Sequence, residues 1–591
     1  MLHHPQQSQS FLKAESNMSH ANRPGHAIFV SIPLVGHLTP LVQQGLELSR
    51  RGWNVTFATL ESGKGPVVSM VDDYLSALAD EGDSSSSFQA ETTIDILSSR
   101  ISLSIAGDCD NELYRNTFPR VAQMPYQNGI YPILSDYVVP MWECVYKSLQ
   151  GPLQQRVDSF HIESASSSPS NGYEDMALLL VGDGFTMAAY DLAQELNATY
   201  AVSLADPIYS LSDRILPSDF LLPAASSRKK RRDMGAALAQ RLVFPFLQFI
   251  LQKAIALHLE PKLNLIRQGT YNRPEPLHFQ TYMMRTLILV TLPFSYEYPR
   301  AMGPLVNLVG AMLPPRGASP KLLQSEELSW IEMSSSTPIA FVNMGTIAIL
   351  NDQKLYEMLL ALVNGAKSGD GASSFRSIWR LSPKQQLELI HRLKIPGDQT
   401  LNDWLKDQNL SHNMYVTSWV SSQQALLEHE NVKVFVSHCG CNSVMEAGVV
   451  GVPLVCIPSF ADQVDMAIRG EEQGVAIFLD KFELDAAGLS NAIREFLFPA
   501  DRKRLELDLS RVQHLQTIAG GVQRAADLIE HAAWYGVSHL ATSDSFQAQW
   551  QFYHFDVVVL KTLILVLAGY FGLRLRRRKE RYEFQSKHKR N

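Results

Sequence analysis

Short apolar runs alternate with amphipathic stretches in the first part of the chain. His26–Ser31 and Trp53–Thr59 read as buried strands, and the residues between them, up to about Arg51, have helical spacing. Thr39-Pro40 predicts the start of this helix, because threonine suits an N-cap and proline suits the first helical turn. The order strand, helix, strand predicts a unit of a doubly wound parallel sheet.

The same alternation returns further along the chain. Ala177–Val181 is a continuous apolar run, and Phe185–Leu196 has helical spacing. A second alternating region begins at Ile339–Asn343. Its strongest strand patterns are Met414–Thr417, Val432–Ser437 and Val452–Pro458. We therefore predict an α/β protein with two doubly wound parallel-sheet domains that face one cleft, with the ligand at the carboxyl ends of both sheets.

The C-terminal end carries a different pattern. Val557–Leu573 is apolar apart from one lysine and one threonine, which is the short limit for a membrane-spanning helix. Aromatic residues (Trp550, Phe552, Tyr553) precede this run and a basic tail follows it from Arg574, an arrangement typical of an interfacial belt and a cytoplasmic stop. A buried core helix is the alternative, but a basic tail is hard to place beside a core. These features predict a C-terminal transmembrane helix.

The composition of the stretches between these patterns predicts where the domains begin and end. The polar first residues contain no apolar run of a secretory signal and predict a disordered leader. Six prolines between Pro293 and Ser325 predict an interdomain linker. The predicted divisions are a leader (1–24), an N-terminal domain (25–295), a linker (296–325), a C-terminal domain (326–535), a transmembrane helix (557–573) and a basic tail (574–591).

Overall composition excludes several classes of protein. A chain of 591 residues with 46% apolar residues can bury at least two cores, which excludes a disordered or fibrous protein. The net charge of −7, without a long basic stripe in the body of the chain, gives no indication of nucleic-acid binding. Five cysteines without a C-x-x-C pair argue against a disulfide framework and a zinc site, so we expect mostly free thiols.

The densest chemical pattern is V-S-H-C-G-C-N-S-V-M-E at residues 436–446. A buried strand ends within it, a glycine turn follows, and a helix is expected to start near Asn442. The free N–H groups and the positive dipole end of such a helix form a site for a diphosphate, to which His438 could also donate a hydrogen bond. Alternatively, Glu446 could only close a capping box with Ser443.

This stretch, with Gly451-Val-Pro-Leu and residues 458–463 after it, resembles the signature of the family 1 UDP-glycosyltransferases. The family pattern begins upstream with a Trp and a Gln, which correspond here to Trp419 and Gln423. Ser422 replaces a usual proline, and Cys441 stands where plant members commonly have tryptophan. The resemblance runs from His26 to the tail. It implies a GT-B type fold and a UDP-sugar as donor substrate.

The resemblance also implies roles for individual residues. Trp419 would stack on uracil, Gln423 would hold the uridine, and Glu446 would bind the ribose hydroxyls. The turn at His438 would bind the diphosphate, and Gly345-Thr346 matches a second phosphate-contacting turn. Asp462 and Gln463 would bind the transferred sugar. The implied donor-binding residues are Gly345, Thr346, Trp419, Gln423, His438, Gly440, Asn442, Ser443, Glu446, Asp462 and Gln463.

Catalytic chemistry is expected in the N-terminal domain. An acceptor hydroxyl is a poor nucleophile and needs a base, for which a histidine with a pKa near 6.5 is suited. His37, in a loop that resembles the family's catalytic histidine loop, follows the first strand. Asp183 ends another strand and matches the family's acidic partner, which would orient the imidazole. The alternative for Asp183 is an N-cap of the helix near Phe185.

Together these features predict inverting transfer of a sugar from a UDP-sugar to a hydroxyl of a small hydrophobic acceptor such as a sterol, lipid or phenol. Glucose is favoured because the family tends to pair a final Gln, here Gln463, with UDP-glucose, and glucuronic acid is the alternative. The apolar segment Leu242–Leu257, next to a basic run at 228–232, is expected to contribute to the acceptor site. No cluster of side chains has metal-ligand spacing, so no metal or further cofactor is expected.

Other functions and the membrane topology stay open at this point. A non-catalytic nucleotide-sugar binding subunit and a UDP-sugar epimerase are the alternative functions. We expect a single-pass membrane protein of the endoplasmic reticulum. The basic tail favours a cytoplasmic C-terminus and a lumenal body, whereas the missing signal favours a tail-anchored cytosolic enzyme. Sequons at Asn197 and Asn409 distinguish the two.

Overall fold

The structure is a computed structural model in which the chain separates into two units, Met1–Val537 and Ser538–Asn591. Predictions for the leader, for the basic run at 228–232 and for most of Leu242–Leu257 concern residues that it does not describe. The described residues are 25–81, 98–124, 130–167, 177–207, 257–269, 275–277, 285–297, 302–313, 325–334, 337–346, 350–366, 374–396, 399–420, 422–541 and 555–588.

Within the described part of the first unit, seven parallel strands form one sheet in the order β3-β2-β1-β4-β5-β6-β7. Its strands are β1 (Gly25–Val30), β2 (Asn54–Thr59), β3 (Ile101–Ile105), β4 (Ala177–Asp183), β5 (Thr199–Leu204), β6 (Leu287–Val290) and β7 (Val306–Leu308). The chain reverses its direction of winding between β1 and β4. Ligands of doubly wound proteins bind at such a point, beyond the carboxyl ends of the strands.

A second sheet of six parallel strands follows among the described residues, in the order β10-β9-β8-β11-β12-β13. Its strands are β8 (Ile339–Asn343), β9 (Arg376–Arg380), β10 (Met414–Thr417), β11 (Val432–Ser437), β12 (Leu454–Cys456) and β13 (Ala476–Phe478). Here the winding reverses between β8 and β11. The predicted α/β fold with two doubly wound sheets is confirmed.

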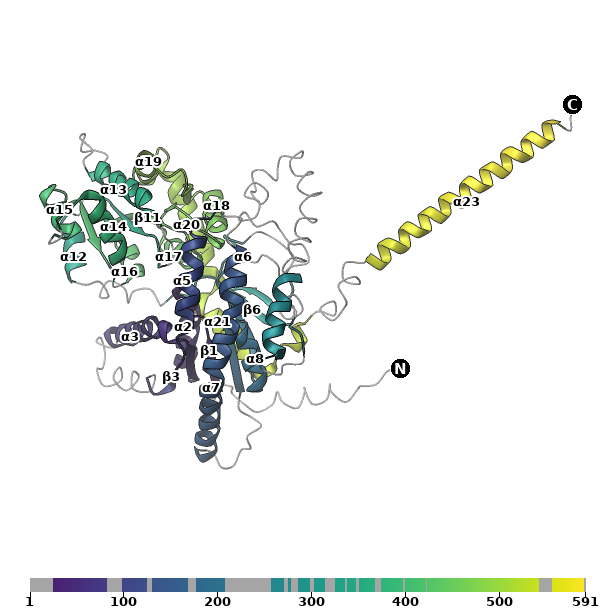
Figure 1. Ribbon diagram of the computed structural model, residues 1–591, viewed down its shortest axis with the longest axis horizontal. Coiled ribbons are helices and arrows are strands. Elements are labelled where there is room, and N and C mark those ends of the chain that lie inside the picture. Colours follow the sequence, from purple (N-terminus) through teal and green to yellow (C-terminus); the bar gives the residue numbers. More distant parts are fainter. Residues whose placement is uncertain are drawn as a thin grey trace. The chain divides into compact units, whose positions relative to one another are not determined.

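Helices cover both sheets (Figure 1). Those that precede β8 are α2 (Val35–Arg50), α3 (Lys64–Glu81), α5 (Asp110–Val121), α6 (Ile130–Ile133), α7 (Val139–Ser167), α8 (Ala188–Glu195) and α12 (Ser325–Glu332). Those that follow are α13 (Asp352–Ala366), α14 (Pro383–Leu393), α15 (Leu401–Asp407), α16 (Gln423–Glu428), α17 (Cys441–Val450), α18 (Asp462–Glu472), α19 (Ala486–Leu497), α20 (Arg502–Ala519) and α21 (Gly521–Tyr535). Because both faces are covered, β1 is buried along its whole length, as expected for parallel strands.

The last helix of the first unit returns to the first sheet. Val522, Ala525 and Ile529 of α21 are buried in one cluster with Ala27 and Val181 of β1 and β4. α21 packs against α2, and against β4 and β5 of this sheet. β7 likewise completes the first sheet, although it lies in the stretch predicted as a linker. Sequence order therefore does not divide the two sheets cleanly.

The predicted start of the first helix is wrong. α2 begins at Val35 with Leu34 as N-cap, and Pro40 lies inside the helix. The Thr39 hydroxyl donates to the carbonyl of Val35 at 2.8 Å instead of capping. The N-cap therefore lies five residues before the predicted Thr39.

The expectation of mostly free thiols is also wrong. In the described part of the chain, disulfides join Cys109 to Cys144 and Cys439 to Cys456, and Cys441 is free and buried. The prediction rested on the spacing of the cysteines along the chain, which does not show how close they lie in the folded protein. β11 and β12 are neighbours in the sheet, and this brings the Cα atoms of Cys439 and Cys456 to 5.4 Å.

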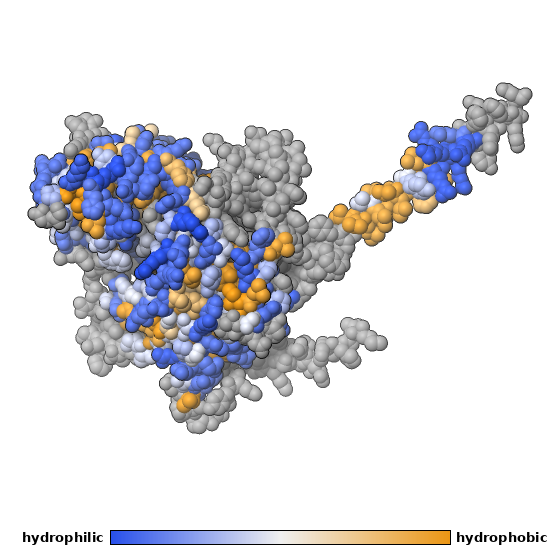
Figure 2. Space-filling view, in the orientation of Figure 1, coloured by the Kyte–Doolittle hydropathy of each residue, from blue (hydrophilic) through white to orange (hydrophobic). Residues whose placement is uncertain are grey.

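The second unit contains α23 (Phe555–His588). Its segment Val557–Arg581 has a mean hydropathy of 1.9 over its most apolar window, and the side chains of this window are exposed in the structure. Figure 2 shows an apolar first part of the helix followed by a hydrophilic part. By length and composition α23 can cross a membrane, as the sequence predicts.

Candidate functional site

A cavity of about 610 Å³ lies between the carboxyl ends of the two sheets. His37 from the first sheet and His438 from the second both line it. Asp183 lies behind His37 and outside the lining. The eleven predicted donor-binding residues all line this cavity: Gly345, Thr346, Trp419, Gln423, His438, Gly440, Asn442, Ser443, Glu446, Asp462 and Gln463. The fold thus brings the predicted site together.

His37 and Asp183 meet where the first sheet reverses its winding. His37 is the third residue of α2, directly after β1, and Asp183 is the last residue of β4. The His37 Nδ1–H donates to Asp183 Oδ1 at 2.6 Å. Asp183 Oδ2 accepts from the Thr186 hydroxyl at 2.8 Å and from the N–H of Phe185 at 3.2 Å. The carboxylate therefore anchors the turn before α8 and orients the imidazole. The alternative that Asp183 is a helix N-cap is wrong, because α8 begins at Ala188 and its N-cap is Met187.

The surroundings of His37 change its protonation. Burial by itself lowers the pKa of His37, but the charge and the hydrogen bond of Asp183 outweigh burial, and the pKa rises to about 9. Asp206 and Asp462 add to the rise. The pKa near 6.5 expected from the sequence is therefore too low. At neutral pH the imidazole is therefore mainly protonated, and it can act as a base only after losing this proton.

His438 lies in the turn between β11 and α17. Its ring packs between Gly440 of the same turn and Gly345, which follows β8. A Cβ atom at Gly345 would lie 2.6 Å from His438 Cε1, and one at Gly440 would lie 2.7 Å from Nε2. Gly345 also has φ +73°, which favours glycine. Burial lowers the pKa of His438 to about 4. The ring is therefore neutral, and it can donate a hydrogen bond without adding positive charge.

The start of α17 is open toward the cavity. Its N-cap, Gly440, has no side chain, and helix geometry gives the N–H groups of Asn442 and Ser443 no acceptor within the helix. The N–H of Cys441 donates to Asp462 Oδ2 at 3.2 Å. Two backbone donors and the positive end of the helix dipole are thus left for an anion.

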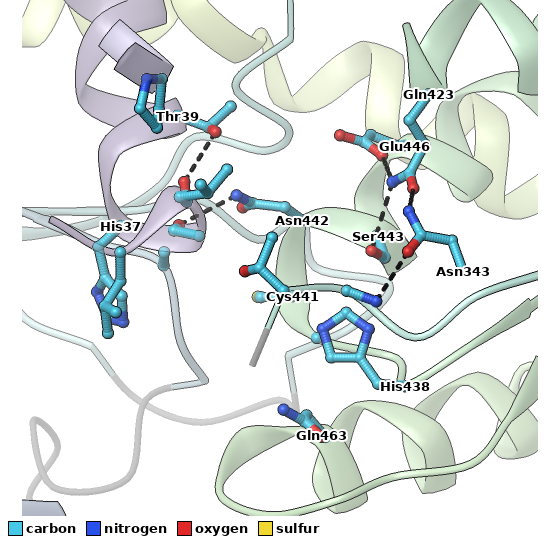
Figure 3. A pocket seen from close by; sticks show the side chains of 18 of the residues that line it. His37, Thr39, Asn343, Gln423, His438, Cys441, Asn442, Ser443, Glu446 and Gln463 are labelled. Atoms are coloured by element: carbon cyan, nitrogen blue, oxygen red, sulfur yellow. Dashed lines mark hydrogen bonds between the residues drawn. The ribbon is translucent and has the colours of Figure 1, made fainter. Parts of the chain in front are cut away.

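The capping box between Ser443 and Glu446 does not form. Gln423 donates instead to the carboxylate of Glu446, and its own carbonyl accepts from the amide of Asn343 at 2.7 Å (Figure 3). Asn343 in turn accepts from the N–H of Gly345 at 2.9 Å. Burial raises the pKa of Glu446 to about 7, against the effect of the Gln423 hydrogen bond. This chain of amides aligns Glu446 with the Gly345 turn.

Gln463 and Trp419, two further predicted donor-binding residues, each have a group that is available to a ligand. Gln463 uses its carbonyl oxygen within its own loop, where it accepts from the N–H groups of Ser459 at 2.8 Å and Phe460 at 3.3 Å. None of the described residues accepts a hydrogen bond from its amide nitrogen, which is left for a ligand. The side chain of Trp419 is 60% exposed, so a planar group can stack on it.

Sequence reasoning missed three charged residues of the cavity, which are Arg380, Asp206 and, on α3, Asp73. Arg380 ends β9, and its guanidinium donates to the carbonyl of Gly345 at 3.1 Å. Burial lowers its pKa. Asp206 lies two residues beyond the end of β5. For Arg380 and Asp206 the available signal was a charge at the end of an apolar strand pattern or two residues beyond it.

The sequence of this chain is similar to those of known proteins. A profile of the family described as "UDP-glucoronosyl and UDP-glucosyl transferase" matches residues 240–590. UDP-glycosyltransferase FPY2 of Fusarium mangiferae is 31% identical over 251 residues, which is 41% of this chain and 43% of the relative. UDP-glucuronosyltransferase 3A1 of Xenopus laevis is 28% identical over 302 residues, 51% of this chain and 52% of the relative. The chain spans about half the length of these curated relatives.

Solved structures share the fold. The crystal structure of the glycotransferase of kitacinnamycin superimposes with a TM-score of 0.52 and 18% sequence identity. The match covers 86% of this chain and 100% of the other. At this identity the likeness concerns the two-sheet architecture and not the substrates.

Proposed function

The chain belongs to the family of UDP-glucoronosyl and UDP-glucosyl transferases, and from this premise we propose that it transfers glucose from UDP-glucose to a hydroxyl of a small hydrophobic acceptor. The transfer inverts the anomeric configuration and needs no metal ion. The observation that carries this proposal is the cavity itself, in which His37 faces the donor-binding residues of the other sheet.

The donor binds on the side of the second sheet. Trp419 stacks on the uracil, and the Gln423–Glu446 pair binds the ribose hydroxyls, for which a buried carboxylate is a strong acceptor. The N–H groups at the start of α17 hold the diphosphate, with His438 as a neutral donor. Arg380, at the Gly345 turn, supplies positive charge to the same half of the cavity.

Transfer is a single displacement. Nε2 of His37 takes the proton of the acceptor hydroxyl, and the acceptor oxygen attacks the anomeric carbon from the face opposite to UDP. The new C–O bond forms as the bond from the anomeric carbon to the UDP oxygen breaks. The proton stays on His37, where Asp183 stabilises the imidazolium through its 2.6 Å hydrogen bond. One displacement inverts the configuration.

The acceptor lies against the first sheet. Apolar and aromatic side chains line this half of the cavity: Ile32, Met70, Tyr74, Phe118, Ile133, Tyr137 and Phe185. Such walls favour an acceptor with a large apolar surface, such as a sterol, a lipid or a phenol. The segment Leu242–Leu257, also expected to contribute, lies outside the described residues except for Leu257.

The experiment that tests the proposal is turnover by the purified chain. It is incubated with UDP-glucose and a panel of sterols, lipids and phenols, and UDP release and the glycosylated product are measured, with and without EDTA. We expect product with an inverted anomeric centre and no loss in EDTA. His37→Ala should lower kcat by at least about 1000-fold while UDP-glucose affinity is kept. Failure of every acceptor in the panel to give UDP release and product would contradict the proposal.

The alternatives predict other results in the same assay. A nucleotide-sugar binding subunit would bind UDP-glucose and release no UDP, with or without His37. An epimerase would change the sugar without any acceptor. UDP-glucuronate is the second donor to test, because several relatives are named UDP-glucuronosyltransferases. A His37 that lines the cavity and is held by Asp183 favours transfer over both alternatives.

We propose that α23 anchors the enzyme in the endoplasmic reticulum membrane with its body in the lumen. The two disulfides of the described body favour an oxidising compartment, and the basic end of α23 favours the cytoplasmic side. Asn197 and Asn409 are exposed, so both sequons would carry glycans in the lumen. Thr199→Val and Ser411→Ala should each remove one glycan, seen as a mobility shift. Unglycosylated wild type in microsomes would contradict a lumenal body.

A further inference from the structure

Lys481 is a buried lysine whose ammonium group joins the half of the first unit built on the first sheet to the half built on the second sheet. It follows β13 of the second sheet. Its Nζ donates to the carbonyl oxygens of Ala122 at 2.9 Å and Met124 at 3.3 Å, in the turn that ends α5, and to the carbonyl oxygen of Ser459. Lysine is rarely buried unless its charge is compensated, and here three carbonyl oxygens match the three N–H donors of the ammonium.

The ammonium of Lys481 is mainly charged at neutral pH. Burial lowers its pKa to about 8, and the charge of Asp480 opposes this change. The turn after α5 favours a positive charge, because the last carbonyl groups of a helix lack partners within it and carry the negative end of its dipole. Removing the ammonium would take a donor from the carbonyl groups of Ala122 and Ser459, which are both buried residues.

The partners of Lys481 are continuous with the walls of the cavity. Phe118 on α5 and Phe460 beside Ser459 both line it, and the centroids of their rings lie 5.8 Å apart. The N–H groups of Ser459 and Phe460 also hold the side chain of Gln463. Lys481 therefore joins the helix that carries part of the acceptor wall to the loop that carries a predicted sugar-binding residue.

Transfer depends on how far apart the two halves lie. His37, the proposed base, belongs to the first half, whereas the donor is proposed to bind on the second, so different parts of the chain hold the reacting atoms. A misplacement of about 1 Å can cost a reaction about 100-fold in rate. The neutral hydrogen bond from Asn442 to Gly36 joins the halves at an exposed position. Lys481 adds a charged donor at a buried position, where water screens it less.

We propose that Lys481 is a positioning residue that holds the end of α5 against the loop before α18, and so keeps the acceptor hydroxyl at reacting distance from the donor sugar. The effect on turnover rests on the proposed function. Lys481 lies outside the cavity lining, so it acts through Phe118 and Gln463 and not by contact with a substrate. Its removal should therefore lower kcat and leave the affinity for UDP, which is proposed to bind on the second half.

Lys481→Met tests this role, because methionine keeps most of the apolar stem and removes the three donors. With UDP-glucose and an acceptor that is turned over, kcat should fall about 10- to 100-fold. The dissociation constant for UDP, measured by calorimetry, should stay as in wild type. Lys481→Gln keeps two N–H donors without the charge, so its kcat should lie between those of wild type and Lys481→Met. If Lys481→Met does not fold, Lys481→Gln decides, with an expected loss of about threefold or more.

Lys354→Met is the matched control. The ammonium of Lys354 also donates to two backbone carbonyl groups, those of Phe482 at 2.8 Å and Leu484 at 2.9 Å, which follow Lys481 closely in the chain. It thus holds the same loop through contacts within the second half, so its loss should change neither kcat nor UDP affinity. Wild-type kcat in both Lys481 variants, or an equal loss in Lys354→Met, would overturn the inference. A UDP affinity that falls together with kcat would also overturn it, since Lys481 would then support the donor site.

Hydrogen exchange without substrates separates this inference from the proposed function. In Lys481→Met the amides of the turn 122–124 and of the loop 457–461 should exchange about tenfold faster than in wild type, because both segments lose the same donor. In Lys354→Met they should exchange as in wild type. This measurement decides on Lys481 even if no acceptor is glycosylated, whereas missing turnover in wild type contradicts the proposed function alone. Wild-type exchange of both segments in the Lys481 variants would overturn the inference.

Discussion

The side-chain amide of Asn442 donates a hydrogen bond to the carbonyl oxygen of Gly36 at 3.0 Å, across the cleft and directly beside His37 (Figure 3). This carbonyl is available because of Pro40. In α2 the residue four positions after Gly36 would normally donate to it, and proline has no N–H. A proline inside a helix thus frees an acceptor that links the two halves of the site.

A double-mutant cycle tests this link. Asn442→Ala should lower kcat/KM about 2- to 10-fold, the usual contribution of one hydrogen bond. Pro40→Ala restores an N–H that can satisfy Gly36 within the helix, so Asn442→Ala should cost less in that background. Steady-state kinetics on the four proteins gives the coupling.

Pro119→Ala is the control for this cycle, since Pro119 also lies inside a helix, α5. In that background the effect of Asn442→Ala should equal that in wild type. Equal effects of Asn442→Ala in the Pro40→Ala and wild-type backgrounds would contradict the link.

The pH dependence of turnover should report on His37. Its pKa is about 9 because Asp183 outweighs the effect of burial. Only the neutral imidazole is a base, so kcat/KM should rise about tenfold per pH unit toward pH 9 and then level off. An aliphatic alcohol as acceptor keeps acceptor ionisation out of the profile between pH 6 and 10.

Asp183→Asn should move this rise to lower pH and lower its plateau by about 100- to 10,000-fold, because the imidazolium loses its carboxylate. Asp73→Asn should leave the midpoint in place. If the midpoint of the kcat/KM profile were the same in Asp183→Asn as in wild type, a group other than His37 would be the base.

Acid stability should depend on His26. This buried imidazole contacts the Thr56 hydroxyl at 2.8 Å, and burial, followed by the charge of Arg156, lowers its pKa to about 4. The unfolded chain, with a pKa of 6.5, binds more protons than the folded chain between these values. Stability is therefore complete above about pH 6.5 and is lost as the pH falls toward 4.

Urea unfolding at pH 7 and pH 5 measures this loss. His26→Gln should make the difference in unfolding free energy between the two pH values smaller, although it costs stability at pH 7. The exposed His514, replaced by Gln, is the control and should leave the difference unchanged. A variant at His26 with the wild-type pH dependence would refute this assignment.

Arg380 should contribute to UDP affinity. Its partly buried guanidinium contacts the Gly345 turn at the donor end of the cavity. Arg380→Gln should weaken UDP binding about 10- to 100-fold, as expected for loss of a charge-assisted hydrogen bond. Arg380→Lys should recover part of the affinity, because the charge is kept and the planar geometry is not.

Calorimetric titration with UDP at two salt concentrations measures both effects, and the exposed Arg502, replaced by Gln, serves as the control. If Arg380→Gln bound UDP like wild type, the guanidinium would serve only to hold the Gly345 carbonyl.

Local pattern was sufficient for much of the fold. The apolar runs at β1, β4, β8 and β11 are bounded by turn residues, and each became a buried parallel strand. Because parallel strands end at one edge of a sheet, the residues after them can be assigned to one cleft from the order of the strands along the chain. For this reason the sequence pointed to His37, Asp183, Gly345 and His438.

By itself the sequence determined two doubly wound sheets, an apolar C-terminal helix and a set of residues at strand ends, because these depend on periodicity and on short-range geometry. Only the tertiary structure decided which side chains from distant segments are in contact. The His37–Asp183 hydrogen bond that raises the pKa of His37, the Cys439–Cys456 disulfide and the Asn442–Gly36 hydrogen bond each join residues that are separated in the sequence. Electrostatic and hydrogen-bond energies depend on distance and burial in space, which spacing along the chain does not contain.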